Sequence, residues 1–512
     1  MNARATPTLR IEIDGRPVDA PRGSTIAAAL GLGASRTSVS GQPRAPLCGM
    51  GVCHECRVQV DGIQQLACMT PCREGQAIRT GDARLQALPT GDAAPPEQRC
   101  DLLVIGAGPA GLQAALAAAP SGARITVLDD NPAPGGQIWR SGPRHRAPGA
   151  CQGLLDELAR HPNVVLVSGA SVVGLAGDRA LLVETARQGW TQRFAQAVLC
   201  TGARERLLPF PGWTLPGVTG AGGLQALIKQ GLDVRGQRIV IAGSGPLLLA
   251  AAASARRAGA RVMHVAEQAA WAEVARFAAV LWRWPAKAWQ AATLFDPGFR
   301  PGAMVVAAQG GGRLQSVTLR TAGGDRQVPC ERLACGWGLV PRTRLAQLMG
   351  CALDAQGAIA VDARQQTSVA GLYAAGECTG IGGNERARLQ GRIAGYCATS
   401  TAEAPPALAR GLAHWNRFAT LVQDRFALRE AATRLADATT LVCRCEDVAL
   451  GALEDCDGWV QAKLQTRCGM GACQGRICGT AAQALRGWTP TPPRQLTGPA
   501  RIATLAALTE RQ

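Results

Sequence analysis

Residues 100–139 constrain the fold of this chain more than any other stretch. They join an apolar strand to a glycine-rich turn and then to an alanine-rich helix. Gly106 would make the turn, Gly108 would let the backbone approach a phosphate, and Gly111 would let helix and strand pack closely. The helix N-terminus presents unpaired N–H groups and a partial positive charge to an anion. We therefore predict a dinucleotide-binding site in this stretch.

The residues after this helix extend the pattern. A second strand at 124–128 ends in Asp129, which is placed to accept hydrogen bonds from a ribose. Gly136 and Gln137 follow directly. A helix packed through glycines without any ligand is the alternative, but all the parts of a dinucleotide site occur here in their usual order.

A first group of thiols lies near the N-terminus. Cys48, Cys53, Cys56 and Cys68 have the spacing C-x4-C-x2-C-x11-C, and the first three match the plant-type [2Fe-2S] loop. Small residues between the thiols would let backbone N–H groups reach the sulfurs of a cluster. A zinc site is the alternative, although zinc sites usually come as paired short hairpins. Cys72 has no partner in the pattern and is expected to be a packed free thiol.

The length of 512 residues predicts three or four domains. The N-terminal residues contain no hydrophobic signal core, and no apolar run reaches the roughly 18 residues of a membrane span. We therefore expect a cytoplasmic protein whose 19 cysteines are not a disulfide framework. The net charge of +17 comes from evenly scattered arginines, and no basic run interleaved with aromatic residues predicts a nucleic-acid groove.

The strand, glycine turn, helix and strand recur at 239–267. Gly243 and Gly245 occupy the first two glycine positions and Glu267 ends the second strand, but Leu248 stands at the third glycine position. A leucine there is expected to push the helix away from the strand. Binding of NAD by this unit is therefore left open, with a retained scaffold domain as the alternative.

Two further segments resemble the FAD domain of glutathione-reductase-like flavoproteins. One is the strand that ends in Thr201 and Gly202, followed by PFPGW and PGV, and the other is the strand 371–374 that runs into Gly376 and Glu377. The resemblance implies that Glu377 holds the ribityl chain of FAD, although aspartate is usual there. No thiol pair suited to a redox disulfide follows the first glycine turn, which disfavours a disulfide reductase. The predicted cofactor contacts are Gly106, Gly108, Pro109, Ala110, Gly111, Asp129, Gly136, Gln137, Thr201, Gly202, Gly376 and Glu377.

A second group of thiols lies near the C-terminus. Cys443 and Cys445 form C-x-C, and Cys473 and Cys478 form C-x4-C. The segment resembles the bacterioferritin-associated-ferredoxin type of [2Fe-2S] domain, which implies these four thiols as ligands. Cys468 is left out of the set because such domains usually carry a small apolar residue at that position. Zinc is the alternative metal.

These features predict an α/β fold, a two-dinucleotide-binding-domain flavoprotein flanked by an N-terminal β-grasp [2Fe-2S] domain and a C-terminal small helical [2Fe-2S] domain. The expected order is a plant-type ferredoxin domain at 1–82, a linker at 83–98, the first part of the FAD domain at 99–216, an NAD-binding-like domain at 217–325, the second part of the FAD domain at 326–400, a helical connector at 401–440, the second iron–sulfur domain at 441–490 and a tail at 491–512.

This order of parts resembles the alpha subunits of heteromeric amine-oxidising flavoenzymes, such as hydrogen cyanide synthase, opine oxidase, D-hydroxyproline dehydrogenase and heterotetrameric sarcosine oxidase. The resemblance implies an FAD-dependent oxidoreductase subunit that receives electrons from a D-amino-acid-oxidase-like catalytic subunit. A flavin between two clusters would convert two-electron transfer into single steps. The electrons would pass on to a respiratory chain, a quinone or oxygen, and in some relatives FMN lies at the subunit interface.

The residues themselves leave two other functions open. One is an NAD(P)H-dependent ferredoxin-type reductase, and the other is a non-catalytic iron–sulfur sensor or scaffold subunit. No catalytic set of acid, base or nucleophile emerges from the five histidines. The aromatic segment 271–295 would face a partner or fill core between the two nucleotide domains.

Overall fold

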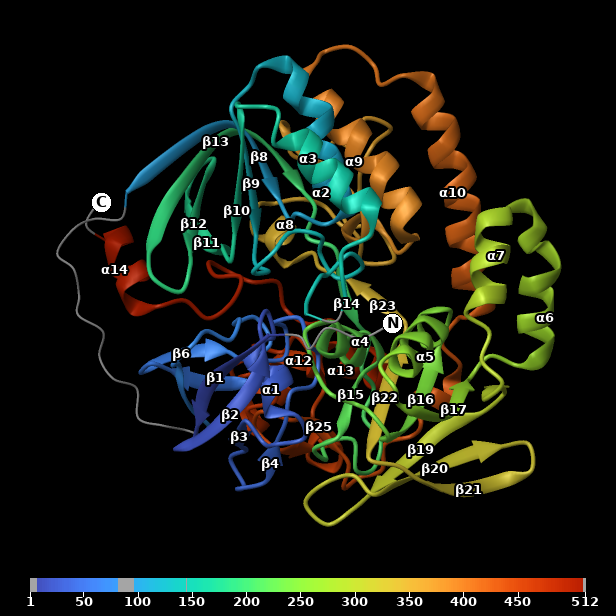
Figure 1. The fold of residues 1–512 in the computed structure, drawn as a ribbon. Coiled ribbons are helices and arrows are strands. Elements are labelled where there is room, and N and C mark those ends of the chain that lie inside the picture. Colours follow the sequence, from blue (N-terminus) through green and yellow to red (C-terminus); the bar gives the residue numbers. More distant parts are fainter. Residues whose placement is uncertain (1–6, 82–95, 144, 510–512) are drawn as a thin grey trace.

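The computed structural model describes residues 7–81, 96–143 and 145–509 (Figure 1). Two separate sheets with parallel strands at their centres organise the chain, and a small domain from each end of the chain packs beside the second of them. No helix among the described residues is long and apolar enough to cross a membrane. All 19 cysteines fall within the described ranges, and each is a buried free thiol.

The N-terminal domain is a five-stranded sheet in the order β2-β1-β7-β5-β6. β1 pairs antiparallel with β2 and parallel with β7, and its alternating pattern turns Leu9 and Ile11 into the core. This mixed sheet with one short helix carries Cys48, Cys53 and Cys56 on the long loop before β5, and Cys68 just after β6. The elements are β1 (Thr8–Ile13), β2 (Arg16–Pro21), α1 (Ile26–Leu30), β3 (Arg36–Thr37), β4 (Pro43–Arg44), β5 (Arg57–Val60), β6 (Ile63–Leu66) and β7 (Ala77–Arg79).

The first large sheet has the order β10-β9-β8-β13-β12-β11, with β24 paired to β13. β8, β9, β10, β13 and β24 run parallel, so their carboxyl ends meet at one edge of the sheet, where the first glycine turn lies. Helices α2, α3 and α9 cover one face (Figure 1). The elements are β8 (Glu97–Ile105), α2 (Pro109–Ala118), η1 (Ala119–Ser121), β9 (Ile125–Asp129), α3 (Gly149–Leu158), β10 (Val164–Ser168), β11 (Ser171–Gly177), β12 (Ala180–Glu184), β13 (Gly189–Leu199), β24 (Leu372–Ala374), η3 (Glu377–Thr379) and α9 (Gly383–Thr399).

The second large sheet is parallel in the order β15-β22-β16-β17-β18, and the hairpins of β19, β20 and β21 extend beside it. The antiparallel pair β14 and β23 carries the chain into this unit and back out. The elements are β14 (Ala203–Glu205), β15 (Val218–Gly220), α4 (Ala221–Lys229), β16 (Arg238–Ser244), α5 (Leu247–Arg257), β17 (Arg261–Glu267), α6 (Trp271–Val280), η2 (Leu281–Arg283), α7 (Pro285–Thr293), β18 (Phe299–Pro301), β19 (Met304–Gln309), β20 (Ser316–Thr321), β21 (Gly324–Pro329), β22 (Arg332–Trp337) and β23 (Leu339–Pro341). Helix α8 (Arg344–Leu348) follows β23 and packs in the core of the first sheet.

The return to the first sheet comes later than the sequence boundary at 325/326. β22 lies after that boundary and yet pairs with β15 and β16 of the second sheet. The sequence RLACGW is a continuous buried strand, and a strand of this kind fits either parallel sheet. Strand pairing, and not the residue composition of the strand, therefore assigns β22 to the unit of the second sheet.

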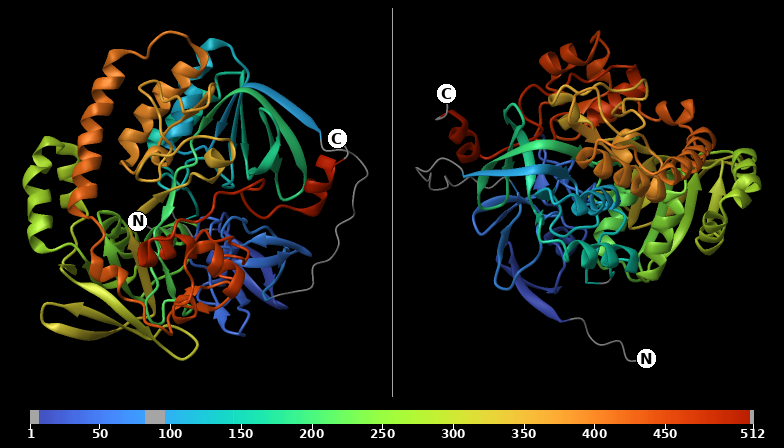
Figure 2. Two further views of the ribbon diagram at one scale, coloured as in Figure 1. Left: turned by 180° about the vertical axis from the view of Figure 1, so that it is seen from behind. Right: turned by 90° about the horizontal axis from the view of Figure 1, so that it is seen from above.

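The C-terminal part crosses the whole molecule. Helix α10 packs on α9 and on α6, and the region from α11 to α13 lies beside the N-terminal domain (Figures 1 and 2). The last segment then returns to the first sheet, where Thr497 donates its backbone N–H to Val173. The predicted linker falls mostly outside the described residues. The elements are α10 (Pro406–Arg425), α11 (Glu430–Thr433), β25 (Leu441–Cys443), β26 (Val448–Ala449), η4 (Gly451–Leu453), α12 (Trp459–Thr466), α13 (Cys478–Arg486) and α14 (Ile502–Thr509).

Candidate functional site

The three glycines of the first turn have different surroundings. Gly106 has φ +108°, and a Cβ there would lie 2.3 Å from the carbonyl oxygen of Cys200. A Cβ at Gly111 would lie 1.7 Å from the oxygen of Gly106. At Gly108 the nearest atom to a Cβ is 3.8 Å away, so the protein itself has room for a side chain. The chain thus requires glycine at 106 and 111, whereas the open cradle at Gly108 fits a phosphate that approaches the backbone.

The two predicted FAD segments meet at the start of α2. Pro109 is the first residue of α2, and a Cβ at Gly376 would lie 2.9 Å from the Cβ of Ala110. The N–H of Gly376 donates to the side chain of Gln390 on α9. Close packing of α9 on α2 therefore brings residues 106–111 and 376–377 to one place, as the sequence predicted for a single nucleotide site.

The two predicted acidic contacts are held by the chain itself. Asp129 accepts backbone N–H groups from Ala107 at 2.5 Å and from Asn131 at 2.7 Å, and burial raises its pKa to about 6. Glu377 accepts N–H groups of Gly382 at 3.3 Å and Gly383 at 2.7 Å, at the start of α9. Each carboxylate fixes a loop that lines the site, and burial also raises the pKa of Glu377.

Arg140 joins the predicted nucleotide site to the first thiol loop, and the sequence analysis did not find it. Its guanidinium is buried and donates to Asn131 at 2.6 Å and to Gln137 at 2.7 Å. The other terminal nitrogen donates to the carbonyl of Gly49 at 3.2 Å. The only sequence signal was an arginine three residues after Gln137. This buried cation fixes the loop of the first thiol group beside the glycine turn.

The first thiol group comes together as predicted. Cys48, Cys53, Cys56 and Cys68 are all buried, and backbone N–H groups point at their sulfurs. The N–H of Gly51 lies 3.3 Å from the sulfur of Cys68, and that of Cys53 lies 3.4 Å from the sulfur of Cys48. A loop that offers four thiols and N–H donors fits an iron–sulfur cluster. Cys72 packs in the apolar core nearby, and burial raises its pKa to about 12.

The second thiol group contains a fifth member, so the exclusion of Cys468 needs correction. The sulfurs of Cys443, Cys468 and Cys478 all lie within 4.8 Å of one another. Cys445 and Cys473 form a pair with their sulfurs 3.7 Å apart. Contacts with Cys443 and Cys478 lower the pKa of Cys468 to about 5. The spacing C-x4-C between Cys468 and Cys473 was the signal for it, and this donor set fits a metal that prefers thiolates.

The two thiol groups are neighbours, which differs from the expected order of a flavin between two clusters. Cys53 and Glu55 line one small space together with four thiols of the second group, Cys443, Cys445, Cys473 and Cys478. The sulfur-bearing loops of both groups also lie in one apolar core. The reason is tertiary, since the N-terminal and C-terminal domains dock on the same side of the second sheet (Figure 2).

The second glycine turn is built, and the start of α5 beside it is accessible: Pro246 is exposed, and Gly245 and Leu247 are partly exposed. Gly243 has φ +141°, and a Cβ there would lie 1.8 Å from the oxygen of Gly336. The end of α10 lies over the turn, where the Ser244 hydroxyl donates to the carbonyl of Phe426 at 2.8 Å. Leu248, at the third glycine position, is completely buried. One side of the turn thus contacts the chain's own segment, while Gly245, Pro246 and Leu247 line a cavity.

One continuous cavity of about 3320 Å³ connects these features. It is lined by the first glycine turn, by the two loops around Glu377 and Thr201, and by residues of both thiol loops. This volume exceeds the few hundred to about 1,000 Å³ of an ordinary ligand pocket. Four arginines line one wall, Arg204, Arg342, Arg344 and Arg476. Burial, together with its arginine neighbours, lowers the pKa of Arg204 to about 10, so this wall favours an anionic group.

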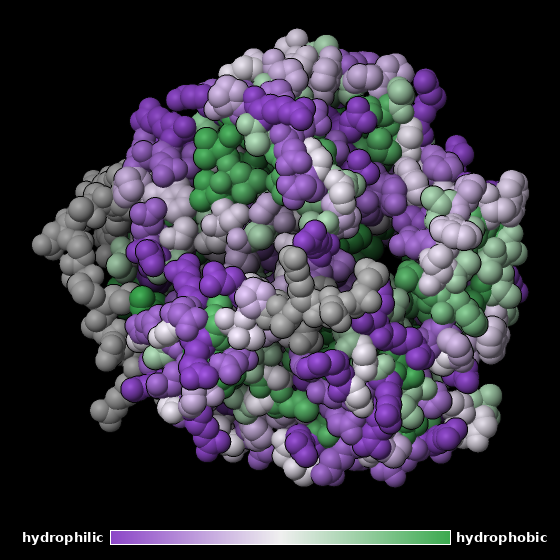
Figure 3. Space-filling model, viewed as in Figure 1, coloured by the Kyte–Doolittle hydropathy of each residue, from purple (hydrophilic) through white to green (hydrophobic). Residues whose placement is uncertain are grey.

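The aromatic segment 271–295 divides into two faces. Phe277 and Trp284 are buried, and both pack against Phe418 of α10. The side chains of the other face are exposed: Trp271 by 63%, Trp282 by 70%, Trp289 by 73% and Phe295 by 67%. Figure 3 shows apolar surface over α6 and α7. Core filling thus describes one face of the segment, and the other face is exposed.

Comparison with known proteins agrees with this architecture. Residues 100–405 match the family of pyridine nucleotide-disulphide oxidoreductases, and residues 6–83 match the 2Fe-2S iron-sulfur cluster binding domain. The chain is 32% identical over 420 residues to an opine oxidase subunit of Rhizobium meliloti, which covers 74% of this chain and 80% of the relative. It is 33% identical over 434 residues to hydrogen cyanide synthase subunit HcnB of Pseudomonas aeruginosa, which covers 75% and 92%.

Among solved structures, L-proline dehydrogenase from P. horikoshii matches with a TM-score of 0.68 and 18% identity over 98% of both chains. This likeness concerns the fold, and it confirms the predicted glutathione-reductase-like architecture together with the family match. The chain therefore belongs to the pyridine nucleotide-disulphide oxidoreductase family, as an FAD and 2Fe-2S oxidoreductase subunit related to opine oxidase and to HcnB.

Proposed function

We propose that this chain is the electron-transfer subunit of a heteromeric dehydrogenase or oxidase that acts on the CH–NH group of an amino acid, an imino acid or an opine. A separate D-amino-acid-oxidase-like subunit would oxidise the substrate, and the acceptor would be a respiratory chain, a quinone or oxygen. The observation that carries the proposal is the shared cavity, which is lined by the glycine turn and by both thiol loops. Nineteen free buried thiols support a reducing compartment such as the cytoplasm.

In this proposal the residues 106–111 and the N-terminus of α2 hold the pyrophosphate of FAD, and the loop of Gly376 and Glu377 lies at its ribityl chain. FAD accepts two electrons as a hydride, whereas a [2Fe-2S] cluster exchanges one electron at a time. Arg140 keeps the first thiol loop beside Gln137 through its bonds to both. The two thiol groups would each hold one [2Fe-2S] cluster.

The arginine wall of Arg204, Arg342, Arg344 and Arg476 supports a second anionic cofactor, such as FMN at a subunit interface. The exposed aromatic face of α6 and α7 supports a partner subunit there, because aromatic residues are enriched in protein interfaces. The proposal gives the second dinucleotide unit a scaffold role, since Leu248 stands at its third glycine position and Phe426 contacts Ser244 of its turn.

The test compares the complex, purified from cells through a tag on this chain, with the same chain separated from its partners. The separated chain should contain FAD and about four irons and four sulfides, as two [2Fe-2S] clusters require. It should not oxidise imino acids, sarcosine, opines or glycine with an artificial acceptor, and the partner should restore bleaching of its flavin by substrate.

Amine turnover by the separated chain would contradict the proposal. Rapid bleaching of its flavin by NADH would instead identify an NAD(P)H-dependent reductase, and a chain without flavin would identify an iron–sulfur scaffold subunit. Zinc in place of iron would contradict electron transfer through the thiol groups, because zinc does not change its oxidation state. FMN released from the intact complex but not from the separated chain would support the interface cofactor.

A further inference from the structure

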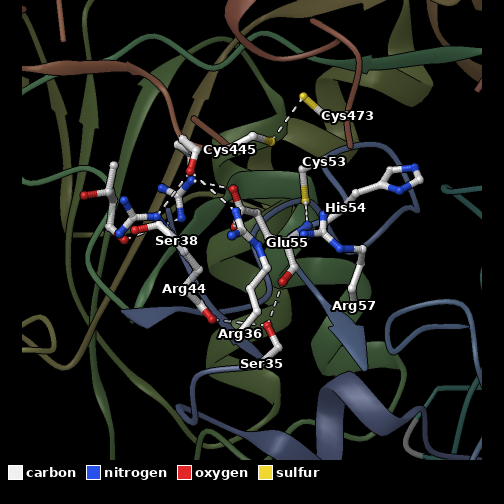
Figure 4. Close-up of polar contacts among 12 residues, drawn as sticks. Ser35, Arg36, Ser38, Arg44, Cys53, His54, Glu55, Arg57, Cys445 and Cys473 are labelled. Carbon is white, nitrogen blue, oxygen red and sulfur yellow. Dashed lines mark hydrogen bonds and ion pairs between the residues drawn. The ribbon is translucent and has the colours of Figure 1, made fainter. Parts of the chain in front are cut away.

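A buried ion-pair network joins the ligand loops of the two thiol groups (Figure 4). Glu55 lies between Cys53 and Cys56 of the first group, and Arg444 lies between Cys443 and Cys445 of the second. The Nε of Arg444 lies 3.2 Å from one carboxylate oxygen of Glu55, and both side chains are at most 3% exposed. One ion pair thus directly connects two loops that are almost 400 residues apart in sequence.

A second arginine, Arg36, also binds the carboxylate of Glu55. Arg36 donates to the other carboxylate oxygen of Glu55 at 2.9 Å, and it is also buried. The backbone of Glu55 is fixed as well, because the Ser35 hydroxyl donates to its carbonyl at 2.7 Å. Its own N–H lies 3.5 Å from the sulfur of Cys53. Glu55 therefore contacts a sulfur of the first thiol group and Arg444 in the loop of the second.

Arg444 makes further contacts besides its ion pair with Glu55. Its guanidinium donates to the carbonyl of Trp213 at 2.7 Å and lies 4.9 Å from the centroid of that indole ring. Next to it, Arg44 pairs with Asp447 at 2.5 Å. The network contains three arginines and two acids, so it carries one net positive charge at the boundary between the thiol groups. The residues are Arg36, Arg44, Glu55, Arg444 and Asp447.

Stability alone is a weak explanation for this arrangement. Desolvation of buried charges offsets much of their attraction, and apolar residues of the same volume often serve a core at least as well. A charged boundary does matter when negative groups lie on both sides of it, because thiolate-bound iron–sulfur centres are anionic. Their reduction potentials respond to nearby net charge and to hydrogen bonds at the sulfurs.

We propose that Glu55 is a positioning residue that couples the two iron–sulfur centres, because its carboxylate ties the ligand loop of the first centre to Arg444 in the ligand loop of the second. This inference rests on the proposed function, which places a [2Fe-2S] cluster in each thiol group. The negative charge of Glu55 holds the potential of the first centre down, and the positive charge of Arg444 holds that of the second up. This order of potentials favours one-electron flow from the first centre to the second.

The test is a redox titration of the purified full chain, followed by electron paramagnetic resonance. Glu55→Gln removes the negative charge and keeps the size, so reduction, which adds negative charge, becomes easier at both centres. Both midpoint potentials should shift upward, with the larger shift at the first centre. Glu55→Asp, which keeps the charge, should restore most of the wild-type values.

The matched control is Glu430→Gln, because Glu430 pairs with Arg434 on the exposed surface and is 74% exposed. It should leave both potentials unchanged. A shift confined to the first centre, or equal shifts in the Glu430→Gln control, would overturn the coupling. A purely structural role of Glu55 would lower the iron content without moving the potentials of the centres that remain.

The interaction between the two centres can also be measured in the wild-type chain. When both centres are reduced, their signals should broaden and relax faster than when one alone is reduced, because neighbouring spins interact. Two independent signals would overturn the inference even if both clusters are present. Iron and sulfide analysis of the same sample separates this outcome from failure of the proposed function, which a chain with fewer than two clusters would indicate.

Discussion

At the residue scale, Gly108 separates the demands of the fold from those of a ligand. A Cβ at this position meets nothing closer than 3.8 Å in the protein. We therefore expect Gly108→Val to fold normally but to block the approach of the pyrophosphate, so that the affinity for FAD falls at least roughly tenfold, about 1.4 kcal/mol of binding free energy. The ratio of flavin to protein absorbance measures the loss, and thermal unfolding measures the fold.

Gly153→Val is the control for Gly108→Val, since a Cβ at Gly153 has no neighbour within 4 Å and that residue lies on the exposed side of α3. It should keep its flavin. A folded Gly108→Val protein with full flavin content would exclude close contact of this backbone with the cofactor.

Cys468 is the residue at which sequence and structure differ most. Its sulfur lies with those of Cys443 and Cys478, and it is completely buried. We expect Cys468→Ser to remove the second centre, so that iron falls from about four to about two per chain and one paramagnetic signal disappears. Cys456→Ser is the control, because Cys456 is also buried in this domain but contacts Gln465 at 3.5 Å. If the Cys468→Ser chain kept its full iron content, Cys468 would not be a ligand, and the set of Cys443, Cys445, Cys473 and Cys478 would stand.

At the element scale, the unit of β16, α5 and β17 repeats the contacts between acid and glycine turn that the first nucleotide unit makes. Glu267 ends β17, but its carboxylate accepts the N–H of Gly245 at 2.7 Å and that of Ala269 at 2.8 Å. In a dinucleotide site this acid would face a ribose. Asp129 holds the first glycine turn in the same way, so these bonds do not distinguish the two units. Leu248 at the third glycine position and the contact of Ser244 with Phe426 do distinguish them.

Glu267 also makes stability depend on pH. Burial raises its pKa to about 7 from the ordinary 4.5. Between these values the folded chain keeps a proton that the unfolded chain has lost, so the free energy of unfolding falls as pH rises, by up to roughly 1.4 kcal/mol per pH unit. Glu267→Gln should make this slope shallower in urea unfolding at pH 5, 6, 7 and 8. Burial also raises the pKa of Glu205 and of Asp129, so part of the pH dependence should remain in the Glu267→Gln chain.

The surface variant Glu430→Gln should leave the pH dependence of stability unchanged, since its carboxylate is exposed. An identical slope in the Glu267→Gln and wild-type chains would show that Glu267 is ionised throughout this range in the folded chain.

At the scale of the whole molecule, the two ends of the chain build one region that contains both thiol groups. The N-terminal domain docks on α4, where the N–H of Gly220 donates to the carbonyl of Leu47 at 2.9 Å. The C-terminal domain docks beside it through Arg444 and Asp447. The last segment then returns to β11 of the first sheet. The nucleotide sheets thus act as a frame that brings both thiol groups to one cavity.

The sequence by itself determined what depends on local spacing. Glycine turns, strand ends and the first thiol loop are short patterns with one geometry each. The sequence therefore predicted the two strand–turn–helix units and the grouping of the first four thiols directly. The turn at Gly106 is an example, since its positive φ excludes other residues at any place in a fold.

Only the tertiary structure decided which distant segments meet. β22 joins the second sheet by strand pairing, Arg140 reaches the first thiol loop across a domain boundary, and Glu55 meets Arg444. These contacts depend on how the domains dock, and docking is set by the shape and burial of whole surfaces, which leave no fixed spacing in the sequence. For the same reason the thiol groups are neighbours, although the chain order had suggested a flavin between them.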